Sequence, residues 1–222
     1  MIELTQENDI AIVRMDDGKV NAGSAHFLTE LNDRLDEAEK GSRAIILTGR
    51  DGVFSAGFDL KTMQSENLSD RHEMTAIGSA TVSRLFSSRI PLVAAVTGHA
   101  LALGAVLNAA CDYSIGTLGK FKYAVNETAL GEIFPPWGYE ILISRLNKNY
   151  VYSAGVLSMV LDVDQAVKAA LIHEAVEPDQ LMPRAMAVAE ELAKLPAEAY
   201  WGNKVAFRGD ALKRVAESVG RF

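Results

Sequence analysis

One glutamate lies where the surrounding sequence would change its acidity. Glu127 belongs to the segment YAVNETALGEI, residues 123–133, in which apolar residues surround a polar triplet ahead of a glycine and two prolines. Burial disfavours the charged form of a carboxylate and raises its pKa, so such a group can act as a base near neutral pH. The residues by themselves equally allow a plain solvated glutamate. Both interpretations stay open at this point.

A second candidate site consists of backbone amides. Residues 98–104 (GHALALG) follow an apolar run, and a helix of small apolar residues is expected from about residue 105 to residue 110. Strand, glycine-bounded loop and helix in that order place backbone N–H groups at a helix start, which favours negative charge. The sequence therefore predicts that this region can hold an anionic group.

Other common catalytic signatures are missing. The chain has no G-x-G-x-x-G, G-x-S-x-G or H-E-x-x-H motif, and GTLGK at 116–120 is interpreted as an ordinary turn. The four histidines have no spacing that would place two on one helical face as metal ligands, and His99 is expected to have a structural or surface role. The one cysteine, Cys111, lies in an apolar run and is interpreted as a buried free thiol.

Composition limits the class of protein. The chain has 222 residues, of which 49% are hydrophobic, and a formal charge of −7 without blocks of like charge. These values predict one medium domain, or a domain with a small appendage, that has no nucleic-acid partner. The N-terminus does not resemble a signal peptide, and no uncharged apolar stretch would span a bilayer, so no membrane partner and a cytoplasmic location are expected.

The elements that must position these groups follow an α/β pattern. Strands are predicted at 10–15, 44–48, 92–97 and 113–115, with loops at 53–60 and 98–104. A helix is predicted to begin after Ser24 as N-cap, and residues 72–88 have weak helical periodicity. Later helices are predicted at 139–146, 151–159, 164–171, 182–195 and 197–219. Strands early and helices late indicate an α/β core with a helical C-terminal portion.

Several motifs in order resemble the crotonase (enoyl-CoA hydratase/isomerase) superfamily over nearly the whole chain. The resemblance implies an α/β spiral of β-β-α units with a short helical C-terminal region, divided into a core at 1–196 and a truncated helical segment at 197–222. It also implies a homotrimer or hexamer. The matching segments are Asn21-Ala22, VFSAGFDL at 53–60, IPLVAAVTGHALALG at 90–104, ACDYSIG at 110–116 and NETALGEIFPPW at 126–137.

The same resemblance implies roles for individual residues. The backbone amides of Phe58 and Leu103 would bind the thioester oxygen of an acyl-CoA substrate, and Glu127 would act as the base. The position of the first catalytic glutamate of hydratases is occupied by Val106, and NETALGEIFPPW is most similar to mitochondrial-type Δ3,Δ2-enoyl-CoA isomerases. Residues implied to bind substrate or CoA are Lys19, Ala22, Ala56, Gly57, Asp59, Leu60 and Gly104.

The resemblance thus predicts an isomerase that converts 3-enoyl-CoA to 2-trans-enoyl-CoA without a metal or redox cofactor, CoA being part of the substrate. The alternatives are a hydratase or another crotonase reaction, such as thioester hydrolysis or carbon–carbon cleavage, and a non-catalytic acyl-CoA-binding homologue. Two departures from the family pattern bear on this choice. Ala102 and Leu103 replace the usual glycines of the amide loop, and Glu132 adds a carboxylate that is either a second acid or a solvated neighbour.

Overall fold

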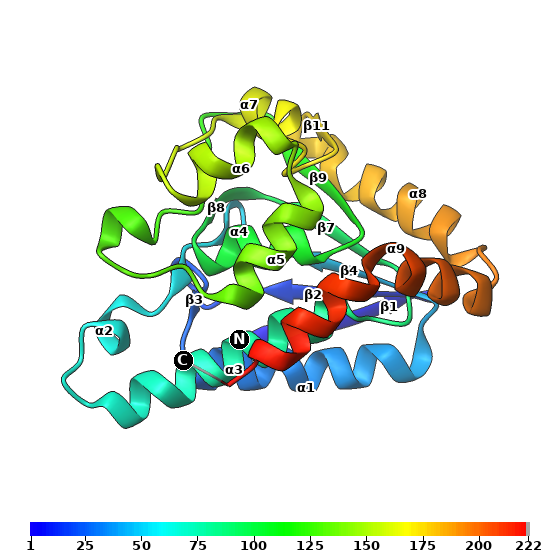
Figure 1. Ribbon diagram of the computed structural model, residues 1–222. Helices are drawn as coiled ribbons and strands as arrows, with labels where there is room; N and C mark the ends of the chain where they lie inside the picture. The colour runs from blue at the N-terminus through cyan, green and yellow to red at the C-terminus, as the bar shows by residue number, and fades with distance from the viewer. Residues whose placement is uncertain (221–222) are drawn as a thin grey trace.

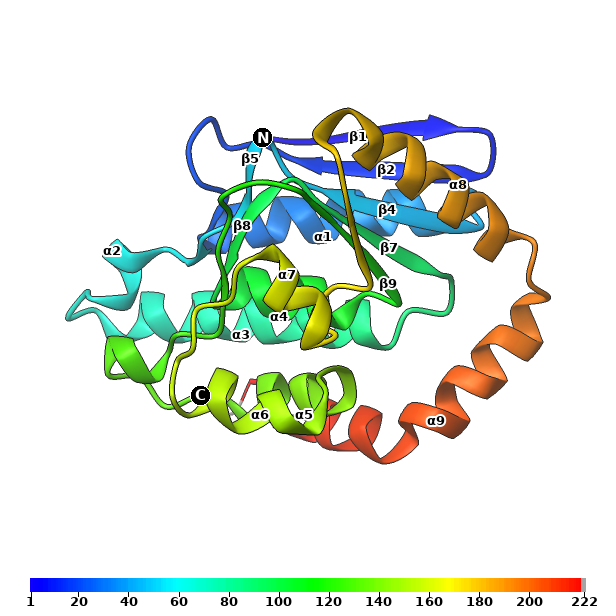
Figure 2. The same ribbon diagram turned by 90° about the horizontal axis from the view of Figure 1, so that it is seen from above.

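The structure, a computed structural model, describes residues 1–220 and is built around a six-stranded sheet (Figures 1 and 2). The strand order is β1-β2-β4-β7-β9-β11. β1 runs antiparallel to β2, and all other neighbours in this sheet are parallel. The strands are β1 (Ile2–Glu7), β2 (Ile10–Met15), β4 (Ala44–Thr48), β7 (Leu92–Val96), β9 (Tyr113–Thr117) and β11 (Glu174–Val176).

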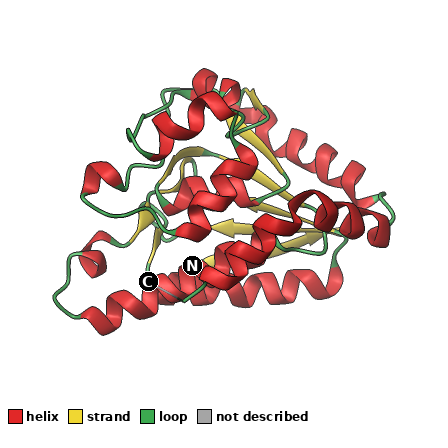
Figure 3. Cartoon of the chain, in the orientation of Figure 1, coloured by secondary structure: helices red, strands yellow, loops and turns green. Residues whose placement is uncertain are grey.

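Four of these strands begin a repeated unit. After β2, β4, β7 and β9 the chain leaves the large sheet, forms short strands and continues into a helix (Figure 3). The short strands are β3 (Ala22–Gly23), β5 (Gly52–Ser55), β6 (Gly57–Phe58), β8 (Gly98–Leu101) and β10 (Tyr123–Ala124). The helices are α1 (Ala25–Gly41), α3 (Leu68–Phe86) after the short α2 (Leu60–Met63), α4 (Leu103–Ala110) and α5 (Pro136–Arg145). The predicted spiral of β-β-α units is confirmed.

The large sheet is covered on both faces. Helix α8 (Leu181–Ala193) packs on one face, where its apolar residues meet side chains of β2, β4, β7 and β9. On the other face the main core includes apolar residues of α1, α3 and α4. All five residues of β4 are therefore buried, which is why its sequence is a continuous apolar run.

The C-terminal part is helical, as predicted. Helices α6 (Lys148–Gly155), α7 (Val163–Lys168) and α9 (Ala197–Ser218) join α5 and α8, with single 3₁₀ turns η1 (Thr128–Leu130) and η2 (Pro178–Gln180). In Figure 1 α9, coloured red, lies along α5, and the two helices pack together. Of the predicted C-terminal segment 197–222, residues 221 and 222 lie outside the described residues. No helix within residues 1–220 is both long and apolar enough to cross a membrane.

Two local expectations were wrong, and one strand was not predicted. The predicted loops at 53–60 and 98–104 contain strands β5, β6 and β8, and the polar N-terminus, for which no element was predicted, forms β1. β1 lies at the edge of the large sheet with mostly exposed residues, so it lacks the apolar run that marks a buried strand. The short strands exist because β8 pairs with both β5 and β10, and such pairing over a few residues leaves no periodic signal.

Candidate active site

Phe58 presents a backbone amide away from its neighbouring strand. In the β3–β6 pairing the ladder bond comes from Asp59 N to Gly23 O (3.4 Å), so the N–H of Phe58 faces away from β3. The preceding Gly57 N donates to the hydroxyl of Ser55 (3.2 Å). On the far side, an added Cβ on Gly78 of α3 would lie 2.5 Å from the Phe58 ring, so this glycine makes room for the ring.

Leu103 supplies a second amide at the start of α4. The first N–H groups of a helix lack intrahelical partners, and Leu103 N has no acceptor among residues 1–220. The preceding Ala102 is held at φ +47° and ψ −122°, a conformation that L-residues rarely adopt and that costs about 1–3 kcal/mol. Its N–H donates to Ala124 O (2.8 Å), which fixes the turn in spite of this strain.

The two amide segments meet at Gly57. An added Cβ on Gly57, whose φ is +100°, would lie 2.8 Å from Ala102 Cβ and 3.5 Å from Leu103 N. Only a glycine therefore allows the residue before Phe58 to approach the start of α4 this closely. Gly104 makes a similar approach, because an added Cβ there would lie 2.4 Å from Ser55 O. Residues from two distant loops thus bring the predicted pair of amides to one place.

The loops predicted to bind CoA lie side by side. Ala56 N donates to Val20 O (3.0 Å), and Ala22 pairs with Gly57 across β3 and β6. The buried Asn21 ties the loops together. Its side-chain amide donates to Phe54 O (3.1 Å), and its backbone carbonyl accepts from the Ser55 hydroxyl (2.8 Å).

The outer members of the predicted CoA set have other surroundings. Asp59 is the N-cap of α2, and its carboxylate accepts from Thr62 N (2.9 Å) and the Thr62 hydroxyl (2.8 Å). Lys19 is exposed, and its backbone oxygen accepts from Arg50 (2.7 Å). Leu60, the first residue of α2, is 56% exposed. Oδ1 of Asp59 is therefore engaged in capping, while Lys19 and Leu60 remain accessible to a ligand.

Glu127 occupies a turn that follows β10, the short strand paired with β8. Strand β10 lies beside β8 and ends at Ala124, the residue whose carbonyl accepts from Ala102 N. Glu127 comes three residues later, is half-buried, and has its Oε2 buried without a hydrogen-bond partner among residues 1–220. Burial raises the pKa of the Glu127 carboxyl to about 7. The Glu127 carboxyl is therefore partly desolvated, and its role as a base stays a prediction.

Two nearby positions distinguish possible chemistries. Val106, in the first turn of α4, is fully buried and has no group that could hold a water molecule. Glu132 has a partner that the sequence did not indicate, since Nη2 of Arg71 on α3 donates to both of its carboxylate oxygens (3.0 and 2.8 Å). This pair is about one-third exposed on each side, and such pairs add only about 0–1 kcal/mol to stability. No sequence signal pointed to Arg71.

Other residues considered from the sequence are structural. The Cys111 thiol donates to Leu107 O (3.4 Å), and burial raises its pKa to about 12, so it is not a ready nucleophile. Nδ1 of His99 accepts from Lys122 N (3.0 Å), and its ring meets the ring of Phe121 edge-on. Within residues 1–220 no three His, Cys, Asp or Glu side chains are placed to hold a metal ion.

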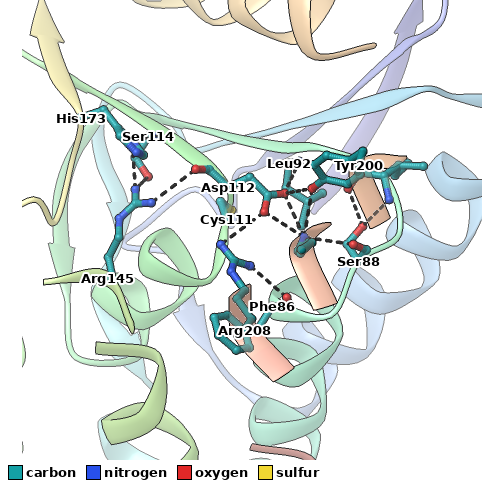
Figure 4. A network of polar contacts seen from close by, with 12 residues as sticks. Phe86, Ser88, Leu92, Cys111, Asp112, Ser114, Arg145, His173, Tyr200 and Arg208 are labelled. Atoms are coloured by element: carbon teal, nitrogen blue, oxygen red, sulfur yellow. Dashed lines mark hydrogen bonds and ion pairs between the residues drawn. The ribbon is translucent and has the colours of Figure 1, made fainter. Parts of the chain in front are cut away.

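Asp112, just beyond the C-terminal end of α4, organises a polar network (Figure 4). Its carboxylate accepts from the Tyr200 hydroxyl (2.7 Å) and pairs with Lys204 (2.9 Å) and Arg208 (3.3 Å), all three on α9. It also accepts from Leu92 N (2.9 Å) at the start of β7. This network fastens α9 to the core.

Comparisons with known proteins agree with this architecture. Residues 5–218 match the family model described as enoyl-CoA hydratase/isomerase. The chain is 30% identical over 200 residues to the mitochondrial enoyl-CoA delta isomerase 1 of Rattus norvegicus, covering 88% of this chain and 69% of that protein.

Solved structures show the same fold. The crystal structure of a probable enoyl-CoA hydratase from Mycobacterium tuberculosis H37Rv superposes with a TM-score of 0.95 at 33% identity, covering 98% of this chain and 92% of that chain. Human mitochondrial delta3-delta2-enoyl-CoA isomerase superposes with a TM-score of 0.94 at 26% identity, covering 99% and 88%. The chain therefore belongs to the enoyl-CoA hydratase/isomerase family and has the crotonase fold that its motifs predicted.

Proposed function

We propose that the protein is an enoyl-CoA isomerase that converts 3-enoyl-CoA to 2-trans-enoyl-CoA. The observation that carries the proposal is the contrast between two positions: Glu127 has a buried carboxylate oxygen without a partner, and Val106 is an apolar residue where hydratases of the family have their first glutamate. One buried base is sufficient for a proton shift, whereas adding water needs a second group to hold or activate the water.

The amides of Phe58 and Leu103 stabilise the intermediate in this proposal. Removing a proton from C2 of a 3-enoyl thioester places negative charge on the thioester oxygen, and preorganised N–H donors aimed at that oxygen lower the barrier by about 3–4 kcal/mol per donor. Neither amide N–H is paired within its own helix or strand pairing. The close approach at Gly57 brings the two segments together. A bound thioester would lie between them.

Glu127 carries the proton. Its carboxylate takes a proton from C2, which gives a dienolate and a neutral carboxylic acid, and the acid returns the proton to C4. The C3–C4 double bond is lost and a C2–C3 double bond forms, so no electron or group leaves the substrate. A carboxyl with a pKa near 7 suits both steps, since it accepts and releases a proton at similar cost near neutral pH. No metal or redox cofactor takes part in this reaction.

A hydratase is the second candidate, because the named relatives include a probable enoyl-CoA hydratase at 33% identity. In that reaction Glu132 would have to supply the second acid–base group. Its carboxylate is already engaged by Arg71, which reduces its availability for a water molecule. The isomerase is therefore preferred.

The test uses purified protein with 3-hexenoyl-CoA, and the conjugated 2-enoyl thioester is followed by its ultraviolet absorbance. We expect turnover by the wild type and a loss of roughly 100- to 10,000-fold in kcat for Glu127→Gln, the usual contribution of a general base. Glu66→Gln, which changes an exposed glutamate, is the matched control and should retain the wild-type rate. Hydration of crotonyl-CoA at a higher kcat/KM than isomerisation would favour the second candidate, and CoA-thioester binding without turnover would indicate a non-catalytic homologue.

A further inference from the structure

The turn that carries Glu127 is closed by Glu132. The carbonyl of Glu127 accepts from Leu130 N and from Glu132 N, both at 2.9 Å. The backbone of Glu132 therefore fixes the backbone from which the Glu127 side chain extends. Gly131, at φ +79°, supplies the left-handed residue that allows the chain to return in this way.

The side chain of Glu132 fastens this turn to α3. The two hydrogen bonds from Arg71 Nη2 span 61 positions in the sequence. Within residues 1–220, the pair of Arg71 and Glu132 is the only ion pair between α3 and residues 127–132. The same helix contacts the amide side of the candidate site, because Gly78 packs against the Phe58 ring. Helix α3 thus links the candidate base to one of the two amides.

The opposite side of the turn is held separately. Ala129 N donates to the Ser158 hydroxyl (3.1 Å), and Ser158 follows α6 in a left-handed conformation at φ +51°. The turn is therefore attached to α3 on one side and to the connection between α6 and α7 on the other. Loss of either attachment would free one side while leaving the core strands intact.

We propose that Arg71 and Glu132 form a latch that holds the turn at residues 127–132 against α3 and so positions the Glu127 carboxylate toward the substrate. Neither residue touches reacting atoms in this proposal, so both are positioning residues. The inference deepens the proposed function and rests on it. An ion pair that is about one-third exposed on each side adds little to stability, and its effect is expected in catalysis instead.

The experiment measures kcat, KM and the pH profile of kcat/KM with 3-hexenoyl-CoA for Arg71→Ala, Arg71→Lys and Glu132→Gln. For Arg71→Ala and Glu132→Gln we expect kcat to fall roughly 10- to 100-fold, the effect of misplacing a catalytic group by about 1 Å. We also expect the acidic limb of the profile to move from about 7 toward 4.5, because a released carboxyl becomes hydrated. Arg71→Lys keeps the charge and should be less affected than Arg71→Ala.

Two further variants separate the latch from general effects. Arg34→Ala removes a pair with similar hydrogen-bond distances, Arg34–Glu37 within α1, and should leave kcat and the acidic limb at their wild-type values. The charge-reversed double variant, Arg71→Glu with Glu132→Arg, can re-form the pair and should recover kcat relative to either reversed single variant. Thermal unfolding of each variant verifies that the fold is kept.

Unchanged kcat and an unmoved acidic limb in both Arg71→Ala and Glu132→Gln would overturn the latch. An increase in KM alone would overturn it as well, since Arg71 would then be a substrate contact. If the wild type gives no product, the proposed function fails, and the latch is tested by NMR titration of the ¹³C-labelled Glu127 carboxyl, assigned with Glu127→Gln. The carboxyl should titrate lower in Arg71→Ala than in the wild type, and equal titration would refute the latch for any reaction.

Discussion

At the scale of single residues, the candidate site depends on a carboxylate kept in an environment that opposes its charge. The cause of the raised pKa of Glu127 is burial, and its own backbone N–H only partly offsets it. A group of this kind lowers the stability of the folded protein in its ionised form. Function and stability are therefore expected to oppose each other at this position.

This opposition predicts a pH-dependent effect of Glu127→Gln on stability. Because the folded pKa of about 7 lies above the ordinary value of 4.5, the contribution of Glu127 is fully favourable below about 4.5 and is lost as the pH rises to about 7. Glutamine stays neutral. The free energy of unfolding of the variant relative to the wild type should therefore increase between these values and level off above them. Urea unfolding from pH 4.5 to pH 8 measures it, and a constant difference would mean that Glu127 is solvated.

At the scale of elements, the start of α4 combines function with strain. Ala102 has a positive φ of +47° immediately before the amide of Leu103, where the resemblance led us to expect glycine. The path of the loop is kept by the bond from Ala102 N to Ala124 O. Alanine is thus tolerated in place of glycine, and the strain at Ala102 is expected to lower the free energy of unfolding.

Ala102→Gly should stabilise the protein. Relief of the backbone strain should stabilise the folded state by about 1–3 kcal/mol. This exceeds the roughly 0.4–1 kcal/mol that is lost because glycine raises the conformational entropy of the unfolded chain. A net gain of about 1 kcal/mol in the free energy of unfolding is expected by urea unfolding. The matched control is Ala105→Gly within α4, which should instead destabilise by about 1 kcal/mol. A loss of stability in Ala102→Gly would show that the positive φ is not strained.

Helix α9 depends on one buried acid. Asp112→Asn would leave Lys204, whose side chain is 4% exposed, and Arg208 without their charge partner. Removing one member of a buried pair costs roughly 3–5 kcal/mol, so a loss near the lower value is expected in urea unfolding because asparagine keeps one acceptor. The double variant with Lys204→Met should lose less than the sum of the two single variants. Strict additivity would mean that the two residues do not interact.

At the scale of the whole molecule, the sequence predicted the elements that carry their own periodicity. Strand β4 was found because a strand buried on both faces has a continuous apolar run. The late helices were found because a helix buried on one face has a periodic apolar pattern. The short strands were missed because each is fixed by a partner far away in the sequence, as β5 is by β8.

The residues of the candidate site fall into the same two groups, those marked by the local sequence and those fixed by contacts with distant segments. Glu127, Phe58 and Leu103 were reached through motifs of the family, whereas the bond from Arg71 to Glu132 joins positions 61 apart and has no motif. The unusual φ of Ala102 was not foreseen either, because the sequence shows that a glycine is replaced but not that the backbone conformation is kept. Contacts between distant loops require the folded chain.

Self-association is the remaining prediction at this scale. The family resemblance implies a homotrimer or hexamer, and Phe207 and Ile133 are 91% and 88% exposed in the single chain. Covering such side chains is worth about 1.5–3 kcal/mol each, which would favour assembly. Sedimentation-velocity ultracentrifugation should give a mass three or six times 24.0 kDa. A single species at 24.0 kDa at micromolar concentration would contradict this prediction.

The pH profile of kcat/KM with 3-hexenoyl-CoA between pH 5 and pH 9 tests the central claim most directly. If the ionised Glu127 carboxylate removes the C2 proton, the value should rise about tenfold per pH unit at low pH and level off above a pKa near 7. Glu127→Gln should lose this limb together with most of the rate. A profile that is flat through pH 7, or a glutamine variant that keeps the wild-type rate and limb, would show that another group moves the proton.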